Sequence, residues 1–215
     1  MVLNLDELNI LRSEPFDEYF GIMRLSKDRI LRRIEFADKF ETLMLSVLVT
    51  MDMMLDYNAL NWGFIDNMIQ DGYDSIIRET MTPDRYTDGM IKQYISDFRK
   101  SMEKLTEPVN FNTPLATLWL LSADRARFNA ENEANDVLNY SDYRDAVEKG
   151  YTKKTWYTEK DDRVRKTHVP LESKTIPINE FFKVGDAYMR FPKDSYLAAN
   201  YPEEIIGCRC ACDYS

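Results

Sequence analysis

Residues 26–55 read SKDRILRRIEFADKFETLMLSVLVTMDMML, and this stretch decides the fold of the first part of the chain. Its apolar side chains recur at a spacing near 3.6 residues, which is typical of one face of an amphipathic helix. The stripe consists of Ile30, Ile34, Ala37, Phe40, Met44, Val47, Leu48, Met51 and Leu55. We expect the charged side chains to lie largely outside the stripe, namely Lys27, Arg32, Arg33, Glu35 and Lys39. The stretch therefore predicts one long helix.

The helical pattern continues beyond this stretch. After a break near Asn58–Gly63, apolar residues at helical spacing run to about Ile77, and Thr82-Pro83-Asp84 then marks a second break. The next apolar stripe consists of Ile91, Tyr94, Ile95, Phe98, Met102 and Leu105. These signals predict two more helices, one on each side of the proline.

A connector with two prolines, Glu107–Pro114, precedes the last helical part. Its final pair, Thr113 and Pro114, is typical of an N-cap followed by the first helical residue. We expect a helix from there to about Asn135. A separate short helix is predicted over Ser141–Glu148, capped by its first residue and stopped by Gly150.

The sequence changes character after residue 150. Helical periodicity fades, and short extended pieces alternate with turn residues, which predicts strands. The expected strands are Thr155–Thr158, Thr175–Ile178, Ala187–Phe191 and Ile205–Cys210. The fold class is therefore α+β, with a helical region over 1–114, helices over 115–150 and a small strand-and-loop module over 151–215.

Composition and charge exclude several classes of protein. The chain has 215 residues and a net charge of −9, with residues 1–150 at −10 and residues 151–215 at +1. No apolar run reaches the roughly 18 residues of a membrane span, and the first residues do not resemble a secretory signal. The acidic part predicts weak general binding to nucleic acid. No glycine-rich phosphate loop occurs. We expect a protein that begins in the cytoplasm.

The cysteines and the single histidine form the first candidate site. Residues 208–212 read CRCAC, and His168 lies upstream. In an extended strand, alternation would place all three thiols on one face. Cys208, Cys210 and His168 could then bind one structural zinc ion, with Asp161, Asp162 or Cys212 as the fourth ligand. The alternatives are a hydrogen-bonded histidine beside cysteines packed as small apolar groups, and redox chemistry.

A second candidate site is the polar stretch 156–168, WYTEKDDRVRKTH. Asp161, Arg163 and Arg165 alternate, so they could share one face of a strand and direct ion pairs at a common partner. His168 near Asp161 also fits acid–base chemistry. An enzyme is therefore an alternative: a metal-dependent nuclease or a toxin-like activity that uses His168, Asp161 and the C-terminal cysteines. A zinc-stabilised adaptor in a bacterial cytoplasm is another.

This stretch and the closing CRC together resemble the phage minor head protein family, also described as the phage Mu protein F-like or head morphogenesis family. Its pattern is roughly W-x-T-x2-D-x-R-x-R-x2-H, an L-D-G turn, F-x-V, Y-P-x-D and a final N-C-R-C. The matching residues are Trp156, Thr158, Asp161, Arg163, Arg165, His168, Leu171, Phe182, Val184, Pro192, Asp194, Cys208, Arg209 and Cys210. Upstream, Arg125-Ala126 and Ala130-x2-Glu133 resemble the family's R-A…A-R-T-E stretch.

The sequence departs from the family pattern at three places. Glu131 and Asn132 stand where A-R-T-E has Arg and Thr. The L-D-G turn is Leu171-Glu172-Ser173, and Gly207 replaces the Asn before C-R-C. The resemblance covers at most residues 115–210.

The resemblance implies a structural protein of the virion without catalytic activity. Such a protein associates with the portal vertex of a tailed phage or prophage and supports head assembly and DNA packaging or delivery. Its partners would be the portal protein and other capsid proteins, with contact to packaged DNA as a further expectation and no membrane or small-molecule substrate. His168, Cys208, Cys210 and Asp161 would hold the module of residues 151–215 together, and residues 1–114 would serve docking or assembly.

Overall fold

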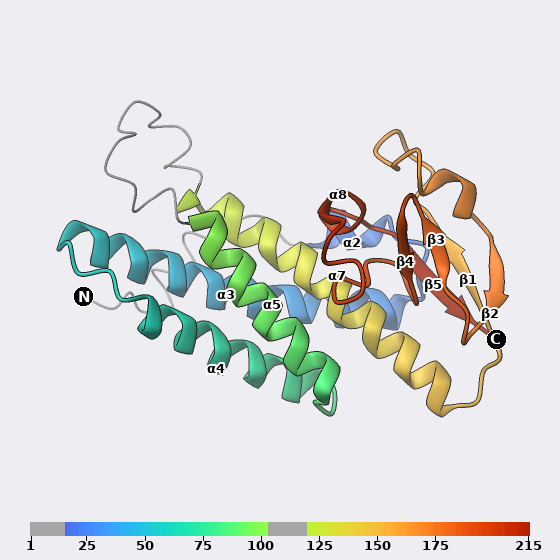
Figure 1. Cartoon of the computed structure of the whole chain (residues 1–215), viewed down its shortest axis with the longest axis horizontal. Helices are drawn as coiled ribbons and strands as arrows, with labels where there is room; N and C mark the ends of the chain where they lie inside the picture. The colour runs from blue at the N-terminus through green and yellow to red at the C-terminus, as the bar shows by residue number, and fades with distance from the viewer. Residues whose placement is uncertain (1–15, 103–119) are drawn as a thin grey trace. The chain divides into compact units, whose positions relative to one another are not determined.

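The computed structural model describes residues 16–102 and 120–215, and it confirms the predicted α+β class (Figure 1). Helices dominate the first part of the chain, and short antiparallel strands follow. The helices are α2 (Asp17–Gly21), α3 (Lys27–Asp56), α4 (Trp62–Thr80), α5 (Arg85–Met102), α7 (Ala123–Glu148) and α8 (Pro202–Ile205). The strands are β1 (Lys153–Tyr157), β2 (Thr175–Pro177), β3 (Phe182–Val184), β4 (Ala187–Met189) and β5 (Ala211–Tyr214).

The described residues form two compact units. The first, which we call the helical unit, contains residues 36–102 and 120–130, and the second, the mixed unit, contains residues 16–35 and 131–215. Helices α3 and α7 each contribute residues to both units. The boundary that we expected between residues 114 and 115 falls outside the described residues.

The helical unit is built on the predicted apolar stripe of α3. From Ala37 to Met51 every stripe residue is buried. An aromatic cluster fills the space between α3, α4 and α5, in which the Phe40 ring lies 4.8 Å from Tyr73 and 5.3 Å from Tyr94, both edge to face. This geometry is favoured between aromatic rings because the positive edge of one meets the negative face of the other.

The two predicted breaks between helices are confirmed and have local causes. The Asn61 side chain accepts a hydrogen bond from the Phe64 backbone N–H and caps the start of α4. The Asp84 carboxylate accepts from the N–H groups of Tyr86 and Thr87 at the start of α5. Side chains of this kind satisfy N–H groups that have no partner inside the helix.

The prediction of two helices over residues 114–148 was wrong in two respects: the first helix does not run through residues 121 and 122, which form a turn before α7, and no break separates it from the second. Helix α7 is continuous from Ala123 to Glu148, because no glycine or proline interrupts it. Ser141 is not an N-cap; it is buried within the helix and accepts a hydrogen bond from Arg32. The stop at Gly150 is confirmed, with φ +76° and the paired hydrogen bonds of a Schellman motif. The predicted start at Thr113 and Pro114 lies outside the described residues.

The mixed unit carries two small antiparallel sheets. One has the strand order β2-β1-β5, in which Trp156 pairs with Cys212, and the other pairs β3 with β4. Three of the four predicted strands overlap observed ones, whereas Ile205–Cys210 is wrong. Residue 205 ends the short helix α8, and the last strand begins only at Ala211. The F-x-V segment forms β3, which no predicted strand covered.

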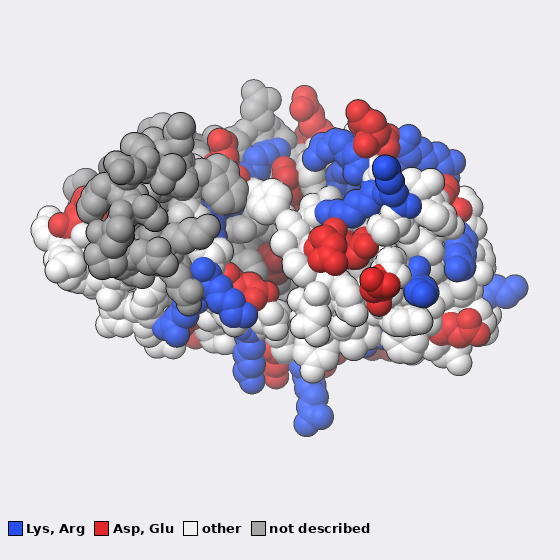
Figure 2. All heavy atoms as spheres, turned by 45° about the horizontal axis from the view of Figure 1, so that its top comes forward, with Lys and Arg blue, Asp and Glu red and all other residues white. Residues whose placement is uncertain are grey.

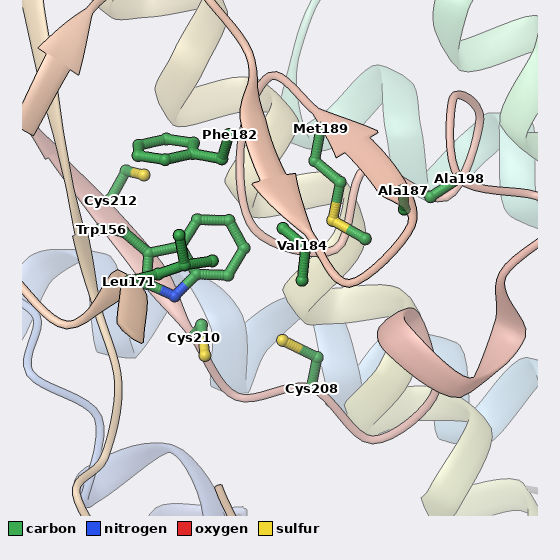
Figure 3. Close-up of a cluster of buried hydrophobic side chains, with 10 residues drawn as sticks. All are labelled: Trp156, Leu171, Phe182, Val184, Ala187, Met189, Ala198, Cys208, Cys210 and Cys212. Atoms are coloured by element: carbon green, nitrogen blue, oxygen red, sulfur yellow. The ribbon is translucent and has the colours of Figure 1, made fainter. Parts of the chain in front are cut away.

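The core of the mixed unit lies between these two sheets. Trp156 is fully buried between Phe182 on one side and Cys210 on the other (Figure 3). The other members of this core are Leu171, Val184, Ala187, Met189, Ala198, Cys208 and Cys212. Among the described residues, no helix combines the length and the apolar character that crossing a membrane requires.

Candidate metal centre

The structure brings His168, Cys208 and Cys210 together. The Nδ1 atom of His168 lies 3.4 Å from the Cys210 sulfur and 3.7 Å from the Cys208 sulfur. All three donor atoms lie within 4.8 Å of one another. The side chains are 1–4% exposed. Of the described residues, these are the ones whose His, Cys or carboxylate donors meet in a metal-like group.

These donors lie outside the strands, His168 in a turn and the two cysteines in an irregular segment. His168 stands directly before a short 3-10 helix, η2 (Val169–Leu171), and the cysteines precede β5. Cys212 lies on β5 itself, outside the donor group, near Phe182 (Figure 3). The prediction that all three thiols share one strand face was therefore wrong.

Glu204 fixes the orientation of the imidazole. Its carboxylate lies 3.1 Å from His168 Nε2 and also accepts a hydrogen bond from the Thr167 hydroxyl at 2.7 Å. A proton on Nε2 is thereby bonded to the carboxylate, and Nδ1 faces the two sulfurs. In metal sites, the ring nitrogen of a histidine that does not bind the metal usually donates to a carboxylate or a carbonyl, as Nε2 does here. No local pattern predicts this pairing, because Glu204 is 36 residues away from His168 in the sequence.

The pKa values of the Cys208 and Cys210 thiols are shifted in opposite directions. The hydrogen bond from Cys210 to Cys208 lowers the pKa of the Cys208 thiol, and it raises the pKa of Cys210. Burial opposes a charge on His168, but the hydrogen bond and negative charge of Cys208 outweigh it and raise the pKa of the imidazole. Without a metal ion, the cluster thus favours a thiolate at Cys208.

Trp156 supplies a further polar group to the cluster. Its ring stands nearly perpendicular to that of His168, with 5.7 Å between the ring centroids. The indole nitrogen is buried, and it is directed toward the Cys210 sulfur, where its hydrogen bond opposes the rise in the pKa of that thiol (Figure 3). A buried N–H with only a weak acceptor is costly, and a thiolate at Cys210 would accept a stronger hydrogen bond from it than a neutral thiol.

Two asparagines of α7 hold the backbone of the CRC segment. The Asn135 amide donates to the Cys208 carbonyl at 2.8 Å, and the Asn139 amide donates to the Cys210 carbonyl at 3.1 Å. Asn139 also donates to the carbonyl of Pro192 at 2.9 Å. These bonds fix both cysteines relative to α7.

The Arg33 side chain in turn binds both asparagines. We had expected it to lie outside the buried stripe of its helix, but it is buried. Its guanidinium is fully buried and donates to Asn135, Asn139 and Asp142. Sequence reasoning missed this network, although its signal is present. Asn135, Asn139 and Asp142 follow one another at spacings of four and three residues, which places three polar groups on one helix face.

Asp161 is not among the metal donors. Its carboxylate lies 2.7 Å from Arg209, and slight burial is outweighed by this ion pair, which holds the pKa of Asp161 below its usual range. Residues 161–168 form turns, so the strand face expected for Asp161, Arg163 and Arg165 does not exist. Arg165 donates to the Ile206 carbonyl, and Arg163 is exposed.

The departures from the family pattern fall at structurally defined positions. Asn132 accepts hydrogen bonds from Lys193 and from the Gly207 N–H, so it anchors the turn before Cys208. Gly207 has φ +71°, a conformation that Gly and Asn both adopt readily. Ser173 has φ +59° at the place where the pattern has Gly. The Glu172 carboxylate accepts from the Thr158 backbone and hydroxyl.

Gly207 provides a test of this backbone argument. We expect Gly207→Asn to leave the free energy of unfolding nearly unchanged and Gly207→Ala to lower it by about 1 kcal/mol, because alanine is strained at positive φ. No atom within 4 Å would obstruct an added Cβ, so backbone strain is the deciding factor. Urea unfolding measures both variants. Equal losses would contradict the argument.

These features define a class: an α+β protein whose small C-terminal part is fixed by a buried His/Cys cluster and a polar network. Residues 83–213 match the family model of phage Mu protein F like proteins. The chain therefore belongs to the phage Mu protein F-like family, as its motifs predicted. The match begins upstream of the segment in which we found the resemblance. No curated protein and no solved structure matches the chain.

Proposed function

We propose that the protein is a structural minor head protein of a tailed phage or prophage, located at the portal vertex. There it supports head assembly and DNA packaging or delivery, after synthesis in the host cytoplasm. The observation that carries the proposal is the family match over residues 83–213, since this family indicates a phage head morphogenesis protein. A morphogenesis protein acts by binding other head proteins and needs no turnover.

The geometry of the His/Cys cluster supports a structural role over the enzyme alternative. The two sulfurs and the imidazole are buried, and they bond to one another and to Glu204. A nucleophile or general base has to be free to react with a substrate atom. These side chains line a small pocket, but their donor atoms bond to one another and to Glu204. Asn135 and Asn139 of α7 instead bind the backbone carbonyls of the two cysteines. Such links suit a module that must keep its shape.

The surface charges support protein partners over DNA as the principal contact. Residues 151–215 contain 11 basic and 10 acidic side chains. Figure 2 shows Lys and Arg gathered on the side of the strand module, with Asp and Glu among and beside them. Phosphate binding depends on uncompensated cations that displace counterions, so we expect any contact with packaged DNA to be weak and confined to exposed side chains such as Arg163.

Co-expression with the portal protein of the same phage tests the proposal. We expect the full chain to co-elute with portal rings in size-exclusion chromatography, and native mass spectrometry then gives its copies per ring. The major tail protein of that phage, used as bait under the same conditions, is the control. A chain that elutes alone beside intact portal rings would contradict portal association.

A further inference from the structure

We propose that His168 Nδ1, Cys208 Sγ and Cys210 Sγ bind one zinc ion that fixes the CRC segment to the turn at His168. Two thiolates and an imidazole are the donor types that zinc prefers in structural sites. The three residues come from two segments about 40 positions apart, so the ion would close a long loop in a module with short strands.

The donor separations fit a tetrahedral ion. With a zinc–sulfur distance of about 2.3 Å and a zinc–nitrogen distance of about 2.0–2.1 Å, the tetrahedral angle places nitrogen and sulfur about 3.6 Å apart. The observed separations between His168 Nδ1 and the two sulfurs are 3.4 and 3.7 Å. The side chains thus stand where bound ligands would stand, without rearrangement of the backbone.

The surroundings of the donors also fit a metal. Glu204 holds Nε2 and directs the other ring nitrogen at the sulfurs, and the buried indole N–H of Trp156 is directed at Cys210 (Figure 3). Metal sites use such second-shell groups to orient ligands and to stabilise thiolate charge. A pair of neutral thiols would leave the indole N–H poorly satisfied.

A small pocket of about 250 Å³, its open mouth included, adjoins the three donors. This pocket is lined by the three donors together with Glu159, Arg163 and Arg165. Glu159 is half-buried there, and burial raises its pKa to about 7. Asp161, which we had expected among the ligands, is engaged by Arg209.

Metal analysis of the full chain, purified without an affinity tag or chelator, tests the proposal. We expect about one zinc per chain. Cobalt titrated into metal-free protein should give the thiolate-to-cobalt charge-transfer absorption of a site with two sulfur ligands. Protein that stays free of zinc after dialysis against the ion, or cobalt spectra without charge transfer, would overturn the assignment.

Matched cysteine variants separate metal binding from packing. Cys210 and Cys212 are both buried in the same core, but only Cys210 belongs to the donor group. We expect Cys210→Ser to lose stoichiometric zinc and Cys212→Ser to keep it; equal loss in both would overturn the proposal. Glu204→Gln keeps all three proposed zinc ligands, so it tests zinc binding if Cys210→Ser does not fold. It should weaken zinc affinity about 10–100-fold, and unchanged affinity would count against the proposal.

Discussion

Asp142→Asn is expected to lower the free energy of unfolding by about 3–5 kcal/mol, the range for removal of one partner from a buried ion pair. Asp142 is buried and lies 3.0 Å from the guanidinium of Arg33, which is fully buried. Arg29 binds the same carboxylate at 2.9 Å. The asparagine variant would leave the buried Arg33 guanidinium without a carboxylate, whereas Arg29 would keep its ion pair with Asp213 at 2.8 Å. The asparagines that Arg33 holds would then loosen the CRC segment.

Urea unfolding at neutral pH measures this loss, and Asp186→Asn is the control. Asp186 is an exposed aspartate in the turn between β3 and β4, so its loss should cost less than about 0.5 kcal/mol. An Asp142→Asn variant within 1 kcal/mol of the wild type, about the size of one ordinary hydrogen bond, would contradict the buried-pair argument.

The same pair predicts a dependence on pH. Burial opposes the charge of Asp142, but Arg33 and Arg29 outweigh burial and hold the pKa of this carboxyl below its ordinary value of 3.8. A depressed pKa in the folded state gives stability that is present above the unfolded pKa and is lost as the pH falls through the folded one. The difference between wild type and Asp142→Asn should therefore shrink below about pH 4.

Trp156→Ala is expected to cost about 3–5 kcal/mol, the usual range for deletion of a buried aromatic side chain. Trp156 is fully buried, and its ring centroid lies 5.0 Å from that of Phe182 and 5.7 Å from that of His168. Its deletion removes the centre of a small core that has few other large side chains. We expect the loss to fall on the mixed unit.

Hydrogen exchange resolved by segment measures where protection is lost. Trp62→Ala is the control, because Trp62 is half-buried at the start of α4 in the helical unit and its loss should leave residues 151–215 protected. Trp156→Phe keeps most of the ring and should retain most of the stability if Trp156→Ala does not fold. Unchanged exchange over residues 151–215 in Trp156→Ala would refute the assigned core.

Local patterns predicted most of the helical architecture. The stripe from Ala37 to Met51, the break at Asp84 and the stop at Gly150 depend on periodicity, capping and positive φ, which act within a few residues. The helix start predicted at Ser141 was wrong because serine, although common at N-caps, also occurs within helices where its hydroxyl has a partner such as Arg32. Arg33 was misplaced because its burial depends on partners in α7, about 100 residues away.

The candidate site was predicted in part. Residue types alone singled out His168, Cys208 and Cys210, and the structure brings their donors together. The predicted strand over Ile205–Cys210 was wrong, since Cys208 and Cys210 lie in an irregular segment before β5. Glu204 and the asparagines of α7 could not be found from spacing to the cysteines, because only the tertiary fold makes them neighbours. The pairing of Asp161 with Arg209 has the same origin.

Quantitative mass spectrometry of purified phage heads tests the central claim most directly. The heads come from the phage or induced prophage that encodes the chain, and both finished heads and assembly precursors are measured against the portal protein as internal standard. Our account predicts the protein at a few copies per portal ring. Its absence from finished heads and from precursors would contradict the account and make the His/Cys cluster a candidate active site.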